Sequence, residues 1–146
     1  MIRQSILLVE DDPGLLDVLS RGLRGEAFTV IAASDGGEAL RLATSAIAAV
    51  VLDIGLPDSD GRDVCRALRA RGVQAPVIFL TARHHFDDRL AGFASGGDDY
   101  ITKPFAFHDL ITRLHRLLRR PSSPTLPPAL DPGVDPIRRT PRSAED

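Results

Sequence analysis

The sequence predicts an α/β fold, in which one parallel five-stranded sheet is covered by helices on both faces. Five short apolar runs alternate with longer segments of helical period between residues 1 and 120. This alternation is typical of β-α units joined by right-handed crossovers, which produce a doubly wound sheet. The runs at 49–52 and 76–80 are continuously apolar, as expected for strands that are buried on both faces.

The expected strands are short apolar runs, and most are followed by a polar residue or a turn. They span residues 5–9, 28–32, 49–52, 76–80 and 100–102. Between them, apolar side chains recur every three or four residues, which predicts five amphipathic helices. The helical segments contain residues 15–23, 39–43, 64–68, 90–94 and 110–118.

Capping residues stand where these helices should begin and end. Asp12 precedes Pro13, which suits an N-cap followed by the first helical position. Asp35 and Glu38 have the spacing of a capping box. Ala106 precedes the last helix without a capping oxygen, at a cost of about 1 kcal/mol. The remaining signals are Asp60 at a helix start, and Gly25, Gly72, Gly96 and Gly97 at helix ends.

The length of 146 residues predicts one domain and a tail. We expect the domain to occupy residues 1–120. Residues 121–146 contain seven prolines and lose the helical period, which predicts a disordered Pro-rich tail or linker.

The composition excludes several classes of function. The net charge of −2 disfavours broad binding to nucleic acid or to anionic lipid. No apolar run approaches the roughly 20 residues of a membrane span, and the N-terminus lacks the pattern of a secretion signal. Cys65 is the only cysteine, so neither an internal disulfide nor a cysteine metal cluster is possible. We therefore expect a cytoplasmic location and no membrane partner.

Polar side chains follow four of the expected strands. Glu10 and Asp11 follow the first, Asp53 the third, Thr81 the fourth and Lys103 the fifth. Because the carboxyl ends of parallel strands share one edge of a sheet, these side chains should converge on one site. Lys103 is the only lysine beside seventeen arginines, which suggests a site that needs a compact cation.

Such a site suits phosphoryl transfer. Clustered carboxylates are good ligands for Mg²⁺, which retains open positions for phosphoryl oxygens. An aspartate that faces the phosphoryl group can attack it and form an aspartyl phosphate, and Asp53 is the best candidate on its central strand. Lys103 would neutralise charge during transfer, and the hydroxyl of Thr81 would hydrogen-bond the product.

The chain resembles the receiver domain of bacterial two-component response regulators. The resemblance is carried by residues 6–12 (Ile-Leu-Leu-Val-Glu-Asp-Asp) and 77–83 (Val-Ile-Phe-Leu-Thr-Ala-Arg), with two further segments. These are Val-Val-Leu-Asp-Ile-Gly-Leu-Pro-Asp-Ser-Asp-Gly at 50–61 and Gly-Asp-Asp-Tyr-Ile-Thr-Lys-Pro-Phe at 97–105. The four segments occur in the family's order and spacing, and they imply a flavodoxin-like sheet with strand order 2-1-3-4-5 and five helices.

The resemblance also implies a mechanism for signal transduction by phosphorelay. A sensor histidine kinase would phosphorylate Asp53, with Thr81 and Lys103 binding the phosphoryl group. Tyr100 would be an aromatic switch, and the Lys103–Pro104 peptide would be cis. The implied ligands of Mg²⁺ are Glu10, Asp11, Asp53 and the carbonyl of Gly55. Such a domain is not an enzyme beyond catalysing its own phosphorylation and dephosphorylation.

The motifs are most similar to those of the winged-helix, OmpR-like regulators. In that class the face formed by helix 4, strand 5 and helix 5 mediates phosphorylation-dependent homodimerisation through ion pairs. The matching residues here are Arg89, Asp98, Asp99, Asp109 and Arg113. The 26 residues after position 120 are too few for a winged helix, so we expect no direct nucleic-acid binding by this chain.

Several alternatives stay open. The chain could be a stand-alone receiver, an N-terminal fragment or truncated form of a DNA-binding regulator, or a receiver-like interaction module that is never phosphorylated. A flavin or nucleotide binder is disfavoured, because its first loop should not be Glu-Asp-Asp-Pro. A phosphatase is disfavoured by Gly55, where a second aspartate is normal. His84 and His85 are adjacent, so we interpret them as loop residues rather than as metal ligands.

Overall fold

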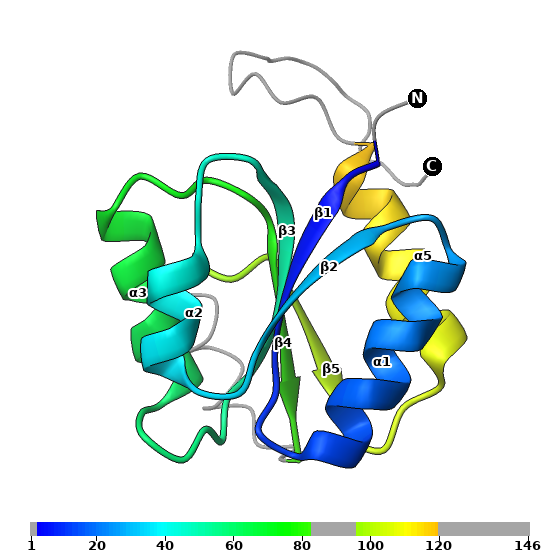
Figure 1. Ribbon diagram of the computed structural model, residues 1–146, viewed down its shortest axis with the longest axis horizontal. Coiled ribbons are helices and arrows are strands. Elements are labelled where there is room, and N and C mark those ends of the chain that lie inside the picture. The colour runs from blue at the N-terminus through cyan, green and yellow to red at the C-terminus, as the bar shows by residue number, and fades with distance from the viewer. Residues whose placement is uncertain (1–2, 83–95, 120–146) are drawn as a thin grey trace, which may run out of the picture.

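The computed structural model describes residues 3–82 and 96–119, which form a five-stranded parallel sheet with helices on both faces (Figure 1). The strand order is β2-β1-β3-β4-β5, which confirms the predicted order 2-1-3-4-5. All four neighbouring strand pairs are parallel. Within the described residues there are four helices instead of the five expected.

The observed elements agree closely with the expected segments. The strands are β1 (Ser5–Val9), β2 (Thr29–Ala33), β3 (Ile47–Asp53), β4 (Val77–Thr81) and β5 (Asp99–Thr102). The helices are α1 (Pro13–Gly25), α2 (Gly36–Leu42), α3 (Gly61–Ala70) and α5 (Phe107–Leu118). The helix expected around 90–94 and the tail 121–146 fall outside the described residues, as do His84, His85 and Arg89.

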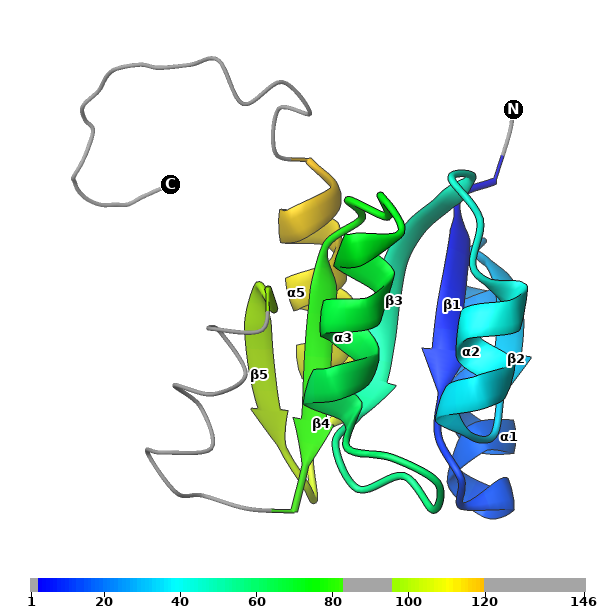
Figure 2. The same ribbon diagram turned by 90° about the vertical axis from the view of Figure 1, so that its left-hand side faces the viewer.

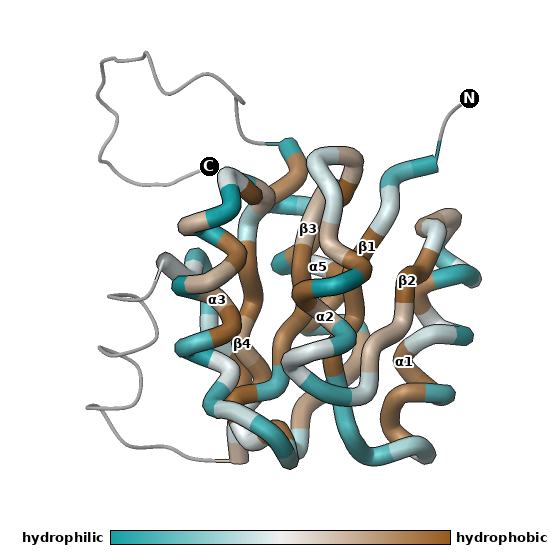
Figure 3. Tube along the Cα trace, turned by 60° about the vertical axis from the view of Figure 1, so that its left-hand side comes forward, coloured by the Kyte–Doolittle hydropathy of each residue, from teal (hydrophilic) through white to brown (hydrophobic). Residues whose placement is uncertain are grey.

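The helices divide into two layers around the sheet. Helices α1 and α5 cover one face, and α2 and α3 cover the other (Figures 1 and 2). Apolar residues are concentrated in the strands, whereas polar residues lie on the outer sides of the helices (Figure 3). No helix in residues 3–82 and 96–119 has the length and apolar character needed to span a membrane.

The central strands contribute to a core on each face of the sheet. In β1, Leu7 and Val9 pack toward α2 and α3, while Ile6 and Leu8 pack toward α1 and α5. Strand β4 is buried along its whole length, as the continuous apolar run predicted. The double burial fixes the positions of the strand ends, because a shifted strand would lose apolar contacts on both faces.

The capping side chains act as the sequence predicted at three helices. Asp12 accepts a hydrogen bond from the Gly14 amide, and Asp60 accepts one from the Arg62 amide. Asp35 accepts one from the Glu38 amide, but Glu38 binds the amide of Ser34 instead of closing a standard capping box. The N-cap of α5 is Ala106, which makes no side-chain capping bond.

Helix α1 ends at Gly25, as the sequence predicts. The left-handed residue of the turn that follows is Ala27, which has a positive φ of 69°. Three amides in this turn still bind helix carbonyls, and the Phe28 amide binds the Leu23 carbonyl at 3.1 Å. The left-handed position of this turn falls at residue 27, two residues after Gly25. An alanine therefore adopts a backbone conformation that glycine would adopt without strain.

Replacing Ala27 with glycine should stabilise the domain. Glycine relieves the strain of the left-handed backbone, which is about 1–2 kcal/mol for alanine. Glycine also gives the unfolded chain more conformational entropy, which lowers stability by roughly 0.5–1 kcal/mol, so the net effect is stabilising. We expect the free energy of unfolding to rise by about 1 kcal/mol in urea denaturation. Ala67→Gly within α3 is the control, and it should lower the free energy of unfolding by about 1 kcal/mol because glycine is unfavourable inside a helix. Equal destabilisation by both changes would contradict the interpretation of Ala27.

Candidate functional site

The carboxyl ends of the strands bring the predicted polar residues to one edge of the sheet. Strands β3 and β4 end at Asp53 and Thr81, whereas Glu10 and Lys103 immediately follow β1 and β5. The arrowheads of these four strands point to the lower edge in Figure 2. A cleft of about 500 Å³ opens there, and its lining includes Asp53, Thr81 and Lys103.

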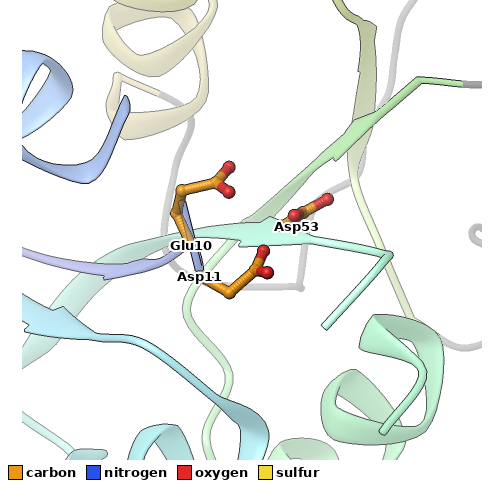
Figure 4. A group of neighbouring side chains, drawn as sticks. All are labelled: Glu10, Asp11 and Asp53. Carbon is orange, nitrogen blue, oxygen red and sulfur yellow. The ribbon is translucent and has the colours of Figure 1, made fainter. Parts of the chain in front are cut away.

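Three carboxylates form the acidic part of the site. One oxygen from each of Glu10, Asp11 and Asp53 lies within 4.8 Å of the others, and Figure 4 shows the side chains gathered at the ends of β1 and β3. Glu10 and Asp53 are only 1% and 6% exposed, whereas Asp11 is exposed. Glu10 and Asp53 therefore form the buried part of the cluster, and Asp11 is its solvent-exposed carboxylate.

Lys103 supplies the positive charge of this cluster. Its Nζ lies 2.8 Å from Glu10 Oε1 and 3.4 Å from Asp53 Oδ2. Burial opposes the charge on the ammonium, but the hydrogen bond to Glu10 and the charge of Asp53 outweigh burial and raise the pKa of Lys103. The ammonium therefore stays protonated between two carboxylates that come from different strands.

The carboxylates exceed the positive charge beside them, which makes the site suited to a metal ion. Burial raises the pKa of Glu10, although hydrogen bonds from Lys103 and the Asp12 amide oppose the shift. A raised carboxylate pKa means that Lys103 does not fully compensate for burial and for the charge of Asp53. Three carboxylates beside one ammonium leave an excess of negative charge, and carboxylate oxygens fit a hard divalent ion such as Mg²⁺.

The loop after β3 (residues 54–60) folds back toward Asp53. The Gly55 amide donates to Asp53 Oδ1 at 3.2 Å, and Gly55 forms an isolated antiparallel bridge with Asp60. The Gly61 amide then donates to the Ile54 carbonyl at 2.8 Å. These contacts hold the acceptor side chain and begin α3 directly beside it.

Gly61 is a structural requirement that the sequence analysis missed. In the sequence, Asp60 and Gly61 indicate only a helix start, but a Cβ at Gly61 would collide with the Asp53 carbonyl and lie 2.8 Å from Ile54 Cα. Both atoms are backbone, so neither can move aside cheaply. Nothing in the local sequence distinguishes this close approach from an ordinary helix start. Arg62, which lines the same cleft and pairs with Asp60 at 2.6 Å, was also missed.

The expected switch residues are both buried. Thr81 is 2% exposed, and its carbonyl accepts a hydrogen bond from the Lys103 amide at 2.6 Å. Tyr100 is 8% exposed, and its ring centroid lies 6.4 Å from that of Phe79. The peptide bond between Lys103 and Pro104 is cis, as the resemblance implied. Both side chains are therefore buried in this structure, and their role as a switch stays a prediction.

The residues expected on a dimer face divide into two groups. Arg113 pairs within the chain with Asp99 at 2.6 Å and with Asp109 at 3.0 Å. Asp98 lies elsewhere, because its carboxylate accepts from the Val77 amide at 2.9 Å and pairs with Arg69 of α3 at 3.2 Å. Three of the expected residues therefore form one local cluster, which Asp98 does not join.

Comparison with known proteins decides the family. The family described as "Response regulator receiver domain" matches residues 6–115. The chain belongs to this family. Its receiver domain is similar to the non-phosphorylated HemR receiver domain from Leptospira biflexa, with 36% identity and a TM-score of 0.77 over 83% of this chain and 100% of that one. It is also similar to the OmpR/PhoB homologue DrrB from Thermotoga maritima, with 34% identity and a TM-score of 0.74 over 80% of this chain and 53% of that one.

The curated relatives are longer than this receiver chain. Response regulator MprA from Mycobacterium sp. (strain KMS) is 44% identical over 141 residues, which cover 92% of this chain and 61% of MprA. Transcriptional regulatory protein PrrA from Mycobacterium tuberculosis is 49% identical over 119 residues, which cover 81% of this chain and 51% of PrrA. The chain therefore spans about half to three-fifths of the relatives that it matches.

Gly61→Ala should destabilise the receiver domain, because the added Cβ forces the backbone of Asp53 and Ile54 to move. We expect a loss of about 1–3 kcal/mol in the free energy of unfolding, as for other overpacked sites. Urea denaturation followed by circular dichroism measures the effect. The matched control is Gly25→Ala, where a Cβ would meet nothing within 4 Å, and its effect should stay within about 0.5 kcal/mol. Similar stabilities for the two variants would contradict the close approach.

Proposed function

We propose that this receiver domain accepts a phosphoryl group on Asp53 and transmits the signal through the surface around β5 and α5. The observation that carries the proposal is the ammonium of Lys103, which lies between Glu10 and Asp53 inside the acidic cluster. A buried ion pair of this kind adds little to stability by itself, so a catalytic role explains its presence better than a structural one.

The reaction is a displacement at phosphorus. An Asp53 carboxylate oxygen attacks the phosphoryl group of a phosphohistidine, the P–O bond forms, and the P–N bond breaks. The electron pair of that bond leaves with the imidazole nitrogen, which takes a proton from water or a neighbouring acid. The Gly55 amide holds Oδ1, and Lys103 faces Oδ2, so the carboxylate is fixed before the donor arrives.

The neighbours of Asp53 have distinct roles in this proposal. Lys103 and the Thr81 hydroxyl bind phosphoryl oxygens once the aspartyl phosphate has formed. Mg²⁺, held by Glu10, Asp11, Asp53 and the Gly55 carbonyl, supplies positive charge that offsets the phosphoryl charge when it is bound. The domain catalyses only its own phosphorylation and dephosphorylation. Its phosphodonor partner is a sensor histidine kinase, and the receiver domain acts in the cytoplasm.

The response to phosphate involves two residues at the ends of neighbouring strands. Thr81 moves toward the phosphoryl group, and Tyr100 occupies the space that Thr81 leaves. The pairing of Thr81 with Thr102 and of Phe79 with Tyr100 across β4 and β5 supports this coupling. Since β5 also carries Asp99 of the ion-pair cluster, a shift of Tyr100 reaches the surface of α5. A difference of a few kcal/mol between the two states is sufficient.

Phosphorylation of Asp53 is directly testable by mass. Incubation with acetyl phosphate and Mg²⁺ should add about 80 Da at one site in intact-protein mass spectrometry. Asp53→Asn should abolish the addition, because the amide oxygen is a poor nucleophile. Asp63→Asn is a suitable control, because this carboxylate lies on α3 and pairs with Arg66 at 2.6 Å. An unchanged mass of the native chain, or persistent labelling of the Asp53 variant, would overturn the proposal.

A second candidate function is the receiver part of a winged-helix transcription regulator. The similarity to MprA covers 92% of this chain, which is more than residues 1–120 supply, so it continues past position 120. This observation favours the receiver part of a longer regulator over a separate interaction module. The boundary near residue 120 stays a prediction, because residues 120–146 lie outside the described part.

In this second candidate, the activated receiver forms a homodimer through the cluster of Asp99, Asp109 and Arg113. The ion pairs within one chain must then open and re-form between chains. Beryllofluoride with Mg²⁺, which mimics the phosphoryl group, should double the mass in sedimentation, and Arg113→Ala should restore the monomer. Arg116→Ala is the matched control, because this arginine is exposed on the same helix. A monomer under both conditions would exclude this output.

A further inference from the structure

The loop at residues 54–60 is tied to the start of α2 by a single carboxylate. Asp58 Oδ1 accepts a hydrogen bond from the Gly36 amide at 2.8 Å, and Oδ2 accepts one from the Gly37 amide at 3.0 Å. The Ser59 hydroxyl donates to the same Oδ1 at 3.0 Å. Both oxygens of the Asp58 side chain thereby bind backbone groups that lie 21 and 22 positions earlier in the sequence.

This connection is more than an ordinary helix cap. Helix α2 already has its own N-cap, Asp35, whose side chain accepts from the Glu38 amide at 2.8 Å. Asp58 instead joins the helix to a different part of the chain. The contact is also close, because a Cβ at Gly36 would collide with Ser59 Oγ and lie 2.8 Å from a methyl group of Val64. Glycine at position 36 allows the loop to approach the helix.

The tethered loop is one wall of the cleft that contains Asp53. The residues of this loop that line the cleft include Gly55, Leu56, Ser59 and Asp60. The Gly55 amide binds Asp53 Oδ1 at 3.2 Å, so the position of the loop determines the environment of the acceptor carboxylate. The wall has few apolar anchors of its own: Ile54 and Leu56 are buried, but residues 57 and 58 are exposed.

We propose that Asp58 is a positioning residue, which sets the metal affinity and the phosphorylation rate of the Asp53 site by fixing this loop on α2. The inference rests on the proposed function, because it concerns the same site. Asp58 does not line the cleft with Asp53, and it acts through the backbone of residues 54–60. A loop held in one conformation presents its backbone groups to the site without an ordering cost at each binding event.

The chemistry of the tether requires a carboxylate. Two amide donors need two acceptor oxygens, and the side chain of asparagine has only one. In Asp58→Asn, the side-chain NH₂ group would face the backbone amide of Gly36 or Gly37. Both groups are donors, so one of the two hydrogen bonds is lost. The bonds from Gly36 and Gly37 lower the pKa of Asp58, which is consistent with an ionised carboxylate at neutral pH.

The test uses the unphosphorylated full chain labelled with ¹⁵N. Hydrogen exchange at the Gly36 and Gly37 amides reports the tether, and amide shifts during Mg²⁺ titration give the Kd. For Asp58→Asn we expect faster exchange at both glycines and a Kd for Mg²⁺ higher by about three- to tenfold. The initial rate of labelling by acetyl phosphate at subsaturating Mg²⁺ should fall by a similar factor. Asp63→Asn, which changes an exposed carboxylate of α3, should leave all three quantities within about twofold.

The outcomes separate positioning from capping. Faster exchange with an unchanged Kd and labelling rate would show that Asp58 only caps α2, and unchanged exchange would show that the tether is absent; either result overturns the inference. If Asp58→Asn does not fold, Asp58→Glu retains the charge, displaces it by one methylene, and should raise the Kd in the same direction. If the native chain binds Mg²⁺ but is not phosphorylated, the proposed function fails, while the comparison of Kd values still decides the role of Asp58.

Discussion

The contact between the Lys103 ammonium and two carboxylates is the interaction on which the site depends. Glu10 and Asp53 are almost completely buried, and burial of like charges is expensive unless a cation lies beside them. Lys103 reaches both, at 2.8 and 3.4 Å, from the end of the edge strand β5. The strands β1, β3, β4 and β5 lie side by side in this order. The ion pair of Lys103 with Glu10 therefore links the end of β5 to the end of β1 across the two strands between them.

Close backbone approaches build the wall of the cleft around this charged centre. Gly61 allows α3 to begin against the carbonyl of Asp53, and Gly36 allows α2 to meet the loop beside Ser59. Asp58 then secures that loop with two hydrogen bonds to backbone amides. Packing and polar tethers thus hold the loop beside the acceptor carboxylate, which favours a preorganised site over one that forms on binding.

Strand β5 connects the site with the surface that carries the proposed output. Lys103 follows its last residue, Tyr100 packs against Phe79 on the face of the sheet that α2 and α3 cover, and Asp99 pairs with Arg113 of α5. A change at the acceptor has a short physical route to this surface, through one strand of four residues. The salt bridge between Arg69 and Asp98 holds the segment just before β5 on α3, so the two ends of the strand have different partners.

The sequence by itself determined the strands, the helix caps at Asp12, Asp35 and Asp60, and the five residues of the acidic site, because these depend on local period and on the shared edge of parallel strands. Only the tertiary structure decided which backbones approach closely and which carboxylate binds which donor. Gly36, Gly61 and Asp58 look like ordinary turn residues in the sequence, since their partners are defined by packing between distant segments. The same reason explains Asp98, because its ion pair with Arg69 of α3 joins two segments that are distant in the sequence.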